Sequence, residues 1–292
     1  MTSPYFAYGS NLNSAAWDAW CREKGINPRY IEPLFAAWLP DHRVAFTRFS
    51  NARQSGVLDI LPAFGCLVPG VVFRVNPGGW SALHRKEGSP GAYRRISRTC
   101  LTRHGKAQSV RTYEVRPEQR RSFVSPTPAY LDIVKAGLEA WSLPHGHIAR
   151  AAANLPPEPL DAVFVYGTLR HGQPLHHHLS GASEEIPATA SGRLFDCGDY
   201  PAMALPSPGA TNLVRGELVL LRDIATLSEL DEVEGFAGFS DEPSLFLRRL
   251  IDVSIEGGRL RRAWVYFGGT ALDTPSPEIP SGDWLAHRAN RR

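Results

Sequence analysis

One short motif occurs twice in the sequence, and this repeat limits the possible folds more than any other feature. "FAYGSNL" (6–12) and "FVYGTLR" (164–170) each place apolar residues before a Tyr-Gly-(Ser/Thr) turn. Repeated motifs indicate repeated structural units, and 292 residues suit two domains of roughly 100–200 residues each. We predict a first unit at 1–153, a Pro-rich linker at 154–162 and a second unit at 163–292.

The segments between the motifs follow the same order in both units. In the first unit, composition and turn signals predict two strands, a short helix and a hairpin at 42–49, 66–75, 76–88 and 92–115. In the second unit, the corresponding strands, helix and hairpin are predicted at 192–203, 212–221, 222–235 and 245–267. The patterns predict an α+β fold of two tandem units, each a small, mainly antiparallel β-barrel with short flanking helices.

Composition excludes several classes of protein. The chain is 43% apolar and 21% charged, and it has no run near the roughly 18 apolar residues that suggest a membrane span. The N-terminus lacks a basic segment followed by an apolar core, so a cytoplasmic location is the default expectation. The four cysteines have no close spacing, and we expect reduced thiols rather than a disulfide framework.

Charge is unevenly distributed along the chain. Residues 1–150 carry 20 Lys and Arg against 10 Asp and Glu, a balance of +10, whereas residues 151–292 carry 12 against 19, a balance of −7. A basic half can attract nucleic acid or a small anion, or it can face the acidic half. The arginines are scattered and no nucleic-acid-binding motif accompanies them, so we predict no nucleic-acid partner.

Two glutamates occupy equivalent places at the predicted ends of the short helices. Glu87 and Glu234 each precede a glycine that stops the helix. The negative end of the helix dipole and burial would both raise the pKa of a carboxyl group there. Such a group suits general acid–base catalysis near neutral pH. The alternative is a solvent-facing glutamate before a capping glycine, and the sequence leaves both open.

The Tyr-Gly turns have the composition of an anion-binding backbone. Glycine permits close approach, successive N–H groups can form a nest, and Ser10 and Thr168 add hydroxyl donors. Neither turn matches a Walker loop or a Gly-x-Ser-x-Gly elbow, so Ser10 is a weak candidate nucleophile. A tight strand-to-helix turn without a ligand is the alternative.

Three consecutive histidines, His176, His177 and His178, suggest a metal site at first sight. Successive residues of a helix point about 100° apart, so three in a row cannot converge on one ion. We therefore predict no metal site from this triplet.

Several motifs together resemble the γ-glutamylcyclotransferase family. In the first unit these are "YFAYGSNL" (5–12), the helix that ends in Glu-Gly, the Tyr-x-Arg strand that follows it, and residues 125–144. The second unit resembles the shorter branch of the superfamily, the avirulence-induced-gene-like or γ-glutamylamine cyclotransferase-like proteins, through "FVYGTLRHGQP", "LFDCGDYPAM", "LDEVEGF" and "IPSGDW".

This resemblance implies a cofactor-free and metal-free cyclisation of a small γ-glutamyl amide. The α-amine of the substrate attacks its own γ-carbonyl, which releases an amine or amino acid and leaves 5-oxoproline. The family's catalytic glutamate corresponds to Glu87 in the first unit and to Glu234 in the second. The resemblance assigns substrate binding to Tyr8, Gly9, Ser10, Asn11, Leu12, Tyr93 and Tyr130, and to Tyr166, Gly167, Thr168, Leu169 and Arg170.

The second unit departs from the family pattern. Phe246 replaces the expected tyrosine, and Leu169-Arg170 replaces Asn-Leu, so its leaving amine is expected to differ, or the unit to be inactive. Two further readings stay open for the whole chain: a non-catalytic ligand-binding or interaction module, and a γ-glutamyl amide hydrolase that uses water as nucleophile. Two fused units can pack as an intramolecular pseudo-dimer, so we expect a monomer without nucleic-acid or membrane partners.

Overall fold

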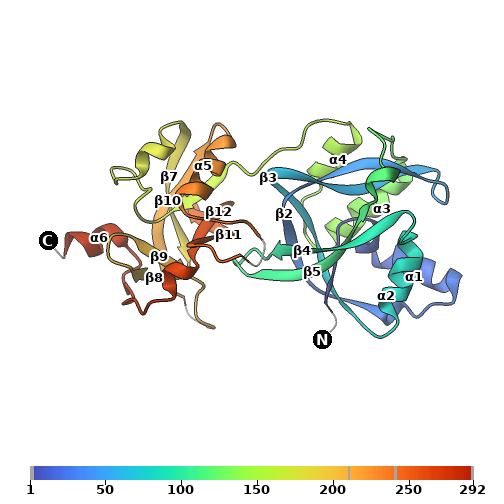
Figure 1. Cartoon of the computed structure of the whole chain (residues 1–292), viewed down its shortest axis with the longest axis horizontal. Coiled ribbons are helices and arrows are strands. Elements are labelled where there is room, and N and C mark those ends of the chain that lie inside the picture. The colour runs from blue at the N-terminus through green and yellow to red at the C-terminus, as the bar shows by residue number, and fades with distance from the viewer. Residues whose placement is uncertain (1–2, 210, 240–241, 291–292) are drawn as a thin grey trace. The chain divides into compact units, whose positions relative to one another are not determined.

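The computed structural model describes residues 3–209, 211–239 and 242–290, which divide into two compact units (Figure 1). The first unit comes largely from residues up to Pro159 and the second largely from residues after it. Helix α4 ends at Ala152 and strand β6 begins at Ala162, with no helix or strand described between them. The domain limits given above stay a prediction. None of the described helices is long and apolar enough to cross a membrane.

The first unit is a closed barrel with strand order β1-β3-β2-β4-β5 among its described residues. Its elements are β1 (Tyr5–Ala7), α1 (Ser14–Lys24), β2 (Ile31–Ser50), β3 (Ser55–Val75), α2 (Gly79–Glu87), β4 (Tyr93–Leu101), β5 (Ala107–Val115), α3 (Pro128–Glu139) and α4 (Gly146–Ala152). Strands β2 and β3 form a long antiparallel ribbon, and three irregularities in register bend it.

The second unit is a closed barrel with strand order β10-β6-β12-β11-β7 among its described residues. Its elements are β6 (Ala162–Val165), β7 (Ala182–Ser191), β8 (Arg193–Asp196), β9 (Pro201–Ala204), β10 (Leu213–Leu221), α5 (Ala225–Val233), β11 (Phe246–Ile255), β12 (Leu260–Gly268) and α6 (Trp284–Ala289). Its core fills the barrel interior with large apolar side chains such as Phe164, Leu218 and Val265.

The two barrels repeat one topology. Strands β1, β3, β2, β4 and β5 take the places that β6, β10, β7, β11 and β12 take in the second barrel. The strand before each Tyr-Gly turn pairs in parallel with the last strand of its barrel, β1 with β5 and β6 with β12. The other described pairings are antiparallel. The predicted fold class, two tandem α+β barrel units, is confirmed.

One glycine in each barrel allows the motif strand to lie close to its neighbour. A Cβ atom on Gly70 would lie 2.3 Å from the backbone oxygen of Ala7, and one on Gly216 would lie 2.2 Å from that of Val165. The ring of Phe6 fills the space in which a Cβ atom of Gly70 would lie, and the ring of Phe164 does the same beside Gly216. Only glycine permits this approach, so both barrels keep it at the same step.

The structure corrects the prediction of one strand at 192–203. The segment forms a hairpin of β8 and β9 in a two-stranded sheet of its own. Gly198 has a φ of 91°, and the Asp196 carboxylate accepts a hydrogen bond from its N–H at 2.9 Å. This left-handed glycine reverses the chain where a continuous strand was expected. The strands predicted at 42–49 and 66–75 are parts of the longer β2 and β3.

Candidate active site

Both candidate glutamates lie where a short helix ends. Glu87 is the last residue of α2, and Glu234 directly follows α5 as its C-cap. The glycines that follow them, Gly88 and Gly235, have φ values of 61° and 59°, the left-handed geometry that ends a helix. The repeated Glu-Gly thus places both carboxylates at the same point of the repeated fold, facing the Tyr-Gly turn of their own unit.

In the first unit the turn and the helix end enclose a small polar cavity of about 30 Å³. Its lining contains Glu87 and six of the predicted binding residues, namely Tyr8, Gly9, Ser10, Asn11, Tyr93 and Tyr130. Three further residues line it that were not assigned from the sequence: Tyr5, Leu58 and Tyr113. Tyr5 stands inside the quoted motif, so the motif itself was a signal for it.

The Glu87 carboxylate has a hydrogen-bonding partner within the turn. Asn11 Nδ2 donates to Glu87 Oε1 at 2.7 Å and also lies 2.9 Å from the Tyr5 hydroxyl. Burial raises the pKa of Glu87, while the Asn11 hydrogen bond and the charges of Lys86 and Arg53 act against the rise. The pKa of Glu87 therefore stays above its ordinary value, but it is moderated by its neighbours.

Tyrosine hydroxyls hold the walls of this cavity in place. Tyr8 donates to the backbone oxygen of Tyr113 at 2.7 Å, and Tyr93 donates to that of Leu58 at 2.7 Å. The Leu58 N–H donates to the Tyr130 hydroxyl at 3.3 Å. Two buried polar atoms of lining residues have no partner among the described residues, the Asn11 Oδ1 and the Tyr113 hydroxyl. Such atoms are suited to bind a polar ligand.

Arg53 adds a positive charge beside this site. Its Nη2 donates to the Ser10 hydroxyl at 3.3 Å, and its guanidinium lies over the Tyr130 ring, 5.3 Å from the centroid. Arginine in such a setting is suited to bind a carboxylate.

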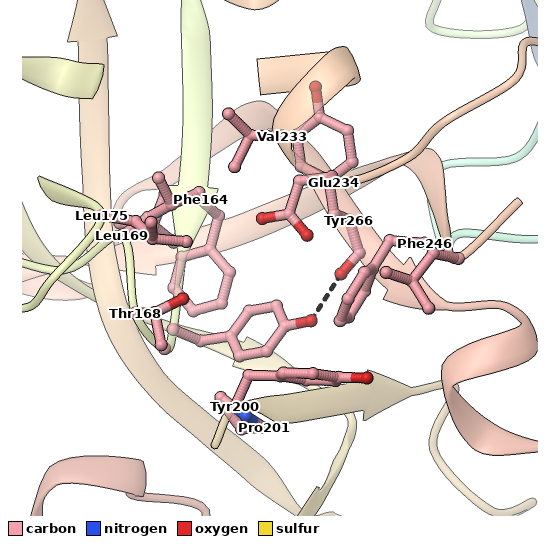
Figure 2. A pocket seen from close by; sticks show the side chains of 14 residues that line it. Phe164, Thr168, Leu169, Leu175, Tyr200, Pro201, Val233, Glu234, Phe246 and Tyr266 are labelled. Atoms are coloured by element: carbon pink, nitrogen blue, oxygen red, sulfur yellow. Dashed lines mark hydrogen bonds between the residues drawn. The ribbon is translucent and has the colours of Figure 1, made fainter. Parts of the chain in front are cut away.

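In the second unit the corresponding cavity is larger, about 190 Å³, and mostly apolar (Figure 2). The predicted residues Tyr166, Gly167, Thr168 and Leu169 line it together with Glu234. Not assigned from the sequence are Phe164, Val165, Leu175, Tyr200, Pro201, Val233, Leu245 and Tyr266, while Phe246 was noted as a departure from the family pattern. Figure 2 shows the Glu234 carboxylate directed into the cavity between Phe164 and Phe246.

Glu234 lacks the support that Glu87 has. No described residue donates a hydrogen bond to its carboxylate, and burial alone raises its pKa to about 7. The main chain beside it is well fixed, because the Phe246 N–H donates to the Glu234 backbone oxygen at 3.1 Å. Across the cavity, the Tyr166 hydroxyl donates to the backbone oxygen of Tyr266 at 2.6 Å, as Tyr8 does to Tyr113 (Figure 2).

The structure places two predicted binding residues outside the cavities. Leu12 is buried against Gly137 of α3, because the turn at Ser10–Leu12 directs it toward that helix. The Arg170 guanidinium is directed away by two acidic groups, with Nε 3.0 Å from Glu217 and Nη1 3.5 Å from Asp283. Neither residue is in the lining of its unit's cavity.

Within the histidine triplet, the rings of His177 and His178 lie against each other with centroids 4.1 Å apart, whereas His176 joins a different cluster. His176 lies with His171 and Glu185, and one potential ligand atom from each lies within 4.8 Å of the others. The sequence pattern pointed only to the adjacent histidines. It gave no signal for Glu185, which comes from β7.

Comparisons with known proteins identify the repeated domain. A family model described as "Gamma-glutamyl cyclotransferase, AIG2-like" matches residues 5–131 and again 163–286. A γ-L-glutamyl-butirosin B γ-glutamyl cyclotransferase of Niallia circulans is 35% identical over 129 residues, which are 43% of this chain and 76% of that protein. The γ-glutamylcyclotransferase of Bos taurus is 30% identical over 147 residues, 48% of this chain and 72% of that protein.

A solved structure described as a γ-glutamyl cyclotransferase aligns with a TM-score of 0.44 at 26% identity, and covers 53% of this chain and 89% of that one. The first matched region begins at the first residue of β1, and the second begins one residue into β6. Each region therefore contains the strands of one barrel and one helix end with its glutamate. The repeat in the sequence and in the topology is thus a repeat of one family domain, and the chain belongs to the γ-glutamyl cyclotransferase, AIG2-like family.

Proposed function

We propose that the protein converts a small γ-glutamyl amide into 5-oxoproline and a free amine, with Glu87 and Glu234 as the acid–base groups. One observation carries the proposal: in each unit a partly buried carboxylate of raised pKa lines a cavity beside a Tyr-Gly-(Ser/Thr) turn. Membership of the family supports a cyclotransferase activity.

The reaction needs one group that first accepts and then donates a proton. The glutamate carboxylate takes a proton from the substrate's α-ammonium, and the freed amine attacks the γ-carbonyl carbon. The resulting tetrahedral intermediate collapses with cleavage of the γ-amide bond, and the glutamic acid returns its proton to the leaving nitrogen. The second proton that the ring nitrogen loses passes to the released amine, which leaves as an ammonium ion. A carboxyl group with a pKa near neutrality serves both steps better than one near 4.5.

Binding a compact substrate conformer lowers the remaining barrier. Amine and carbonyl belong to one molecule and close a five-membered ring, so most of the orientational cost is removed once the chain of the substrate is folded. In favourable systems this contribution reaches roughly 7–11 kcal/mol. We propose that the turn backbones, Tyr8–Asn11 and Tyr166–Leu169, hold the glutamyl portion, since backbone N–H groups can bind its carboxylate or the developing oxyanion.

The test is a substrate panel with matched variants. Wild-type protein, Glu87→Gln, Glu234→Gln and the double variant are incubated with γ-glutamyl amino acids and γ-glutamyl amines, and 5-oxoproline and glutamate are quantified. Gln keeps the size of Glu but cannot exchange the proton, so we expect a loss of about 10²–10⁴-fold in kcat/KM for the substrates of the altered unit. Glu229→Gln, exposed on α5 and outside both cavities, is the control for folding.

Each alternative has a distinct outcome. Glutamate in place of 5-oxoproline identifies a γ-glutamyl amide hydrolase. Binding of panel members without turnover identifies a ligand-binding module. Turnover that persists in the double variant contradicts the assignment of both bases. Loss in one single variant only identifies the active unit.

A further inference from the structure

A cluster outside the Glu234 cavity joins a loop to a barrel strand of the second unit. His171 and His176 come from the loop that follows the Tyr166-Gly167-Thr168 turn, and Glu185 comes from β7. His171 Nδ1 lies 3.3 Å from Glu185 Oε2, and His176 Nε2 lies 3.4 Å from Glu185 Oε1. The three side chains have no part in the proposed cyclisation.

These separations suit ligand atoms around one ion as well as long hydrogen bonds, and one potential ligand atom from each residue lies within 4.8 Å of the others. Two donors bound tetrahedrally at about 2.0–2.1 Å lie roughly 3.3–3.4 Å apart. The His171 side chain is 76% exposed, so it can rotate toward the other two groups and admit an ion from solvent.

A backbone contact orients His176 as a ligand. Its Nδ1 lies 3.3 Å from the backbone oxygen of Leu169, which favours a proton on Nδ1 and leaves the Nε2 lone pair toward Glu185. A histidine that ligates a metal commonly donates its other N–H to a carbonyl or carboxylate in this way. The loop is anchored as well, since the His171 N–H donates to Glu217 at 2.8 Å.

We propose that His171, His176 and Glu185 bind one divalent transition-metal ion of the Zn²⁺ type. Two imidazole nitrogens and one carboxylate suit Zn²⁺, whereas Mg²⁺ and Ca²⁺ prefer oxygen ligands. Solvent completes the coordination at the exposed side of His171.

The ion would tie the cavity loop to the barrel. Leu169 and Leu175 line the Glu234 cavity, and both lie in the loop that carries the two histidines. The Leu175 N–H already donates to the Thr168 backbone oxygen at 3.0 Å, which closes the loop on itself. A metal bridge from His171 and His176 to Glu185 would stabilise this wall of the cavity against opening.

Metal binding is tested directly on the full-length, untagged protein. After treatment with a chelator, Zn²⁺ is titrated by calorimetry in the absence of any γ-glutamyl compound, so the outcome does not depend on catalysis. We expect one saturable site per chain that Mg²⁺ does not occupy. His171→Ala, His176→Ala and Glu185→Gln should each weaken Zn²⁺ binding at least about tenfold. His178→Ala, from the same triplet but outside the cluster, should bind Zn²⁺ as the wild type does.

Two further readouts distinguish this site from other donors. Co²⁺ bound at the cluster should give the visible absorption of a tetrahedral ion, and His176→Ala should lose it. Zn²⁺ should slow hydrogen exchange in residues 168–176 of the wild type but not of Glu185→Gln. Zn²⁺ stoichiometry and affinity that are unchanged in all three cluster variants would overturn the proposal, as would the absence of saturable Zn²⁺ binding to the folded wild type.

Discussion

The two cavities share one frame and differ at the residue that follows the Ser/Thr of the turn. Asn11 occupies this position in the first unit and donates a hydrogen bond to Glu87 at 2.7 Å. Leu169 occupies it in the second unit, and there no described residue donates to the Glu234 carboxylate. The same helix end and the same turn thus hold one carboxylate that is hydrogen-bonded and one that is not.

The difference extends to the walls. Tyr93 of the first unit donates to the Leu58 backbone, whereas Phe246 of the second has no hydroxyl and packs edge to face against Tyr200. The first cavity is small and polar, at about 30 Å³, and the second is larger and apolar, at about 190 Å³. The repeated backbone positions the carboxylate in both units, while a few side chains around it set its pKa and the space for substrate.

The largest expected effect is on the free energy of unfolding, whose dependence on pH should differ between Glu234 and Glu87. The pKa of Glu234 is about 7 in the folded protein and near 4.5 when exposed, so its contribution to stability is intact below about pH 4.5 and is lost as pH rises through 7. The loss has an upper limit of about 3 kcal/mol, which water in the cavity would reduce. Glu234→Gln cannot ionise and should therefore gain stability over the wild type as pH rises.

Urea denaturation at about pH 5.5 and about pH 8.5, with proteolysis to report each unit separately, measures this gain. Glu87→Gln is the matched variant, and we expect a smaller alkaline gain because Asn11, Lys86 and Arg53 already favour the ionised Glu87. Equal gains in both variants would show that hydrogen bonding and charge do not distinguish the two sites.

Much of this frame was predictable from the sequence. The repeated turn, the short helix between the strands and the final hairpin, and both Glu-Gly helix ends follow from local patterns of apolar residues and glycine. The position of the difference was also visible, because Asn11 and Leu169 hold the same place in the two motifs. The helix ends and the turns meet because the topology repeats. The alignment of the units was wrong at one strand, since the counterpart of β2 in the second barrel is β7 and not the segment 192–203.

Other features depend on contacts distant in the sequence, and local patterns do not encode these. Arg170 leaves its cavity because Glu217 and Asp283, which are 47 and 113 residues away, bind its guanidinium. The hairpin at 192–203 was missed although Gly198 between Cys197 and Asp199 is a turn signal. His176 meets Glu185 because the loop folds back against β7, and no spacing in the sequence predicts this contact.

A second, intermediate effect concerns the charge beside the first cavity. Arg53 donates to Ser10, and we expect it to bind a carboxylate on the substrate. In a Glu234→Gln background, Arg53→Gln should raise KM about tenfold for γ-glutamyl amino acids. Arg53→Lys should retain part of the binding, since it keeps the charge but not the planar group.

Steady-state kinetics with γ-glutamyl amines, which have no carboxylate on the leaving group, is the control for this variant. If KM rises equally for amines and amino acids, Arg53 contacts the glutamyl portion or supports the turn through Ser10, rather than selecting the leaving group.

The smallest expected effect tests the Asn11/Leu169 difference itself. Asn11→Leu removes the hydrogen bond to Glu87, so the pKa of Glu87 should rise further and the basic form should be reached at higher pH. Leu169→Asn should act in the opposite direction on Glu234 and lower its pKa from about 7. Loss or gain of one such bond changes kcat/KM about two- to tenfold at a fixed pH.

The measurement is the pH profile of kcat/KM, taken for each exchange in a background where the other unit's glutamate is Gln, because this profile reports the pKa of the free enzyme. The acidic limb should move to higher pH in Asn11→Leu and to lower pH in Leu169→Asn. Opposite movements from reciprocal changes at one position are not expected from a general loss of packing, which would lower activity at every pH. If both limbs stay in place, the residue after the Ser/Thr shapes the cavity without setting the ionisation of the glutamate, and the contrast between the units lies in their walls.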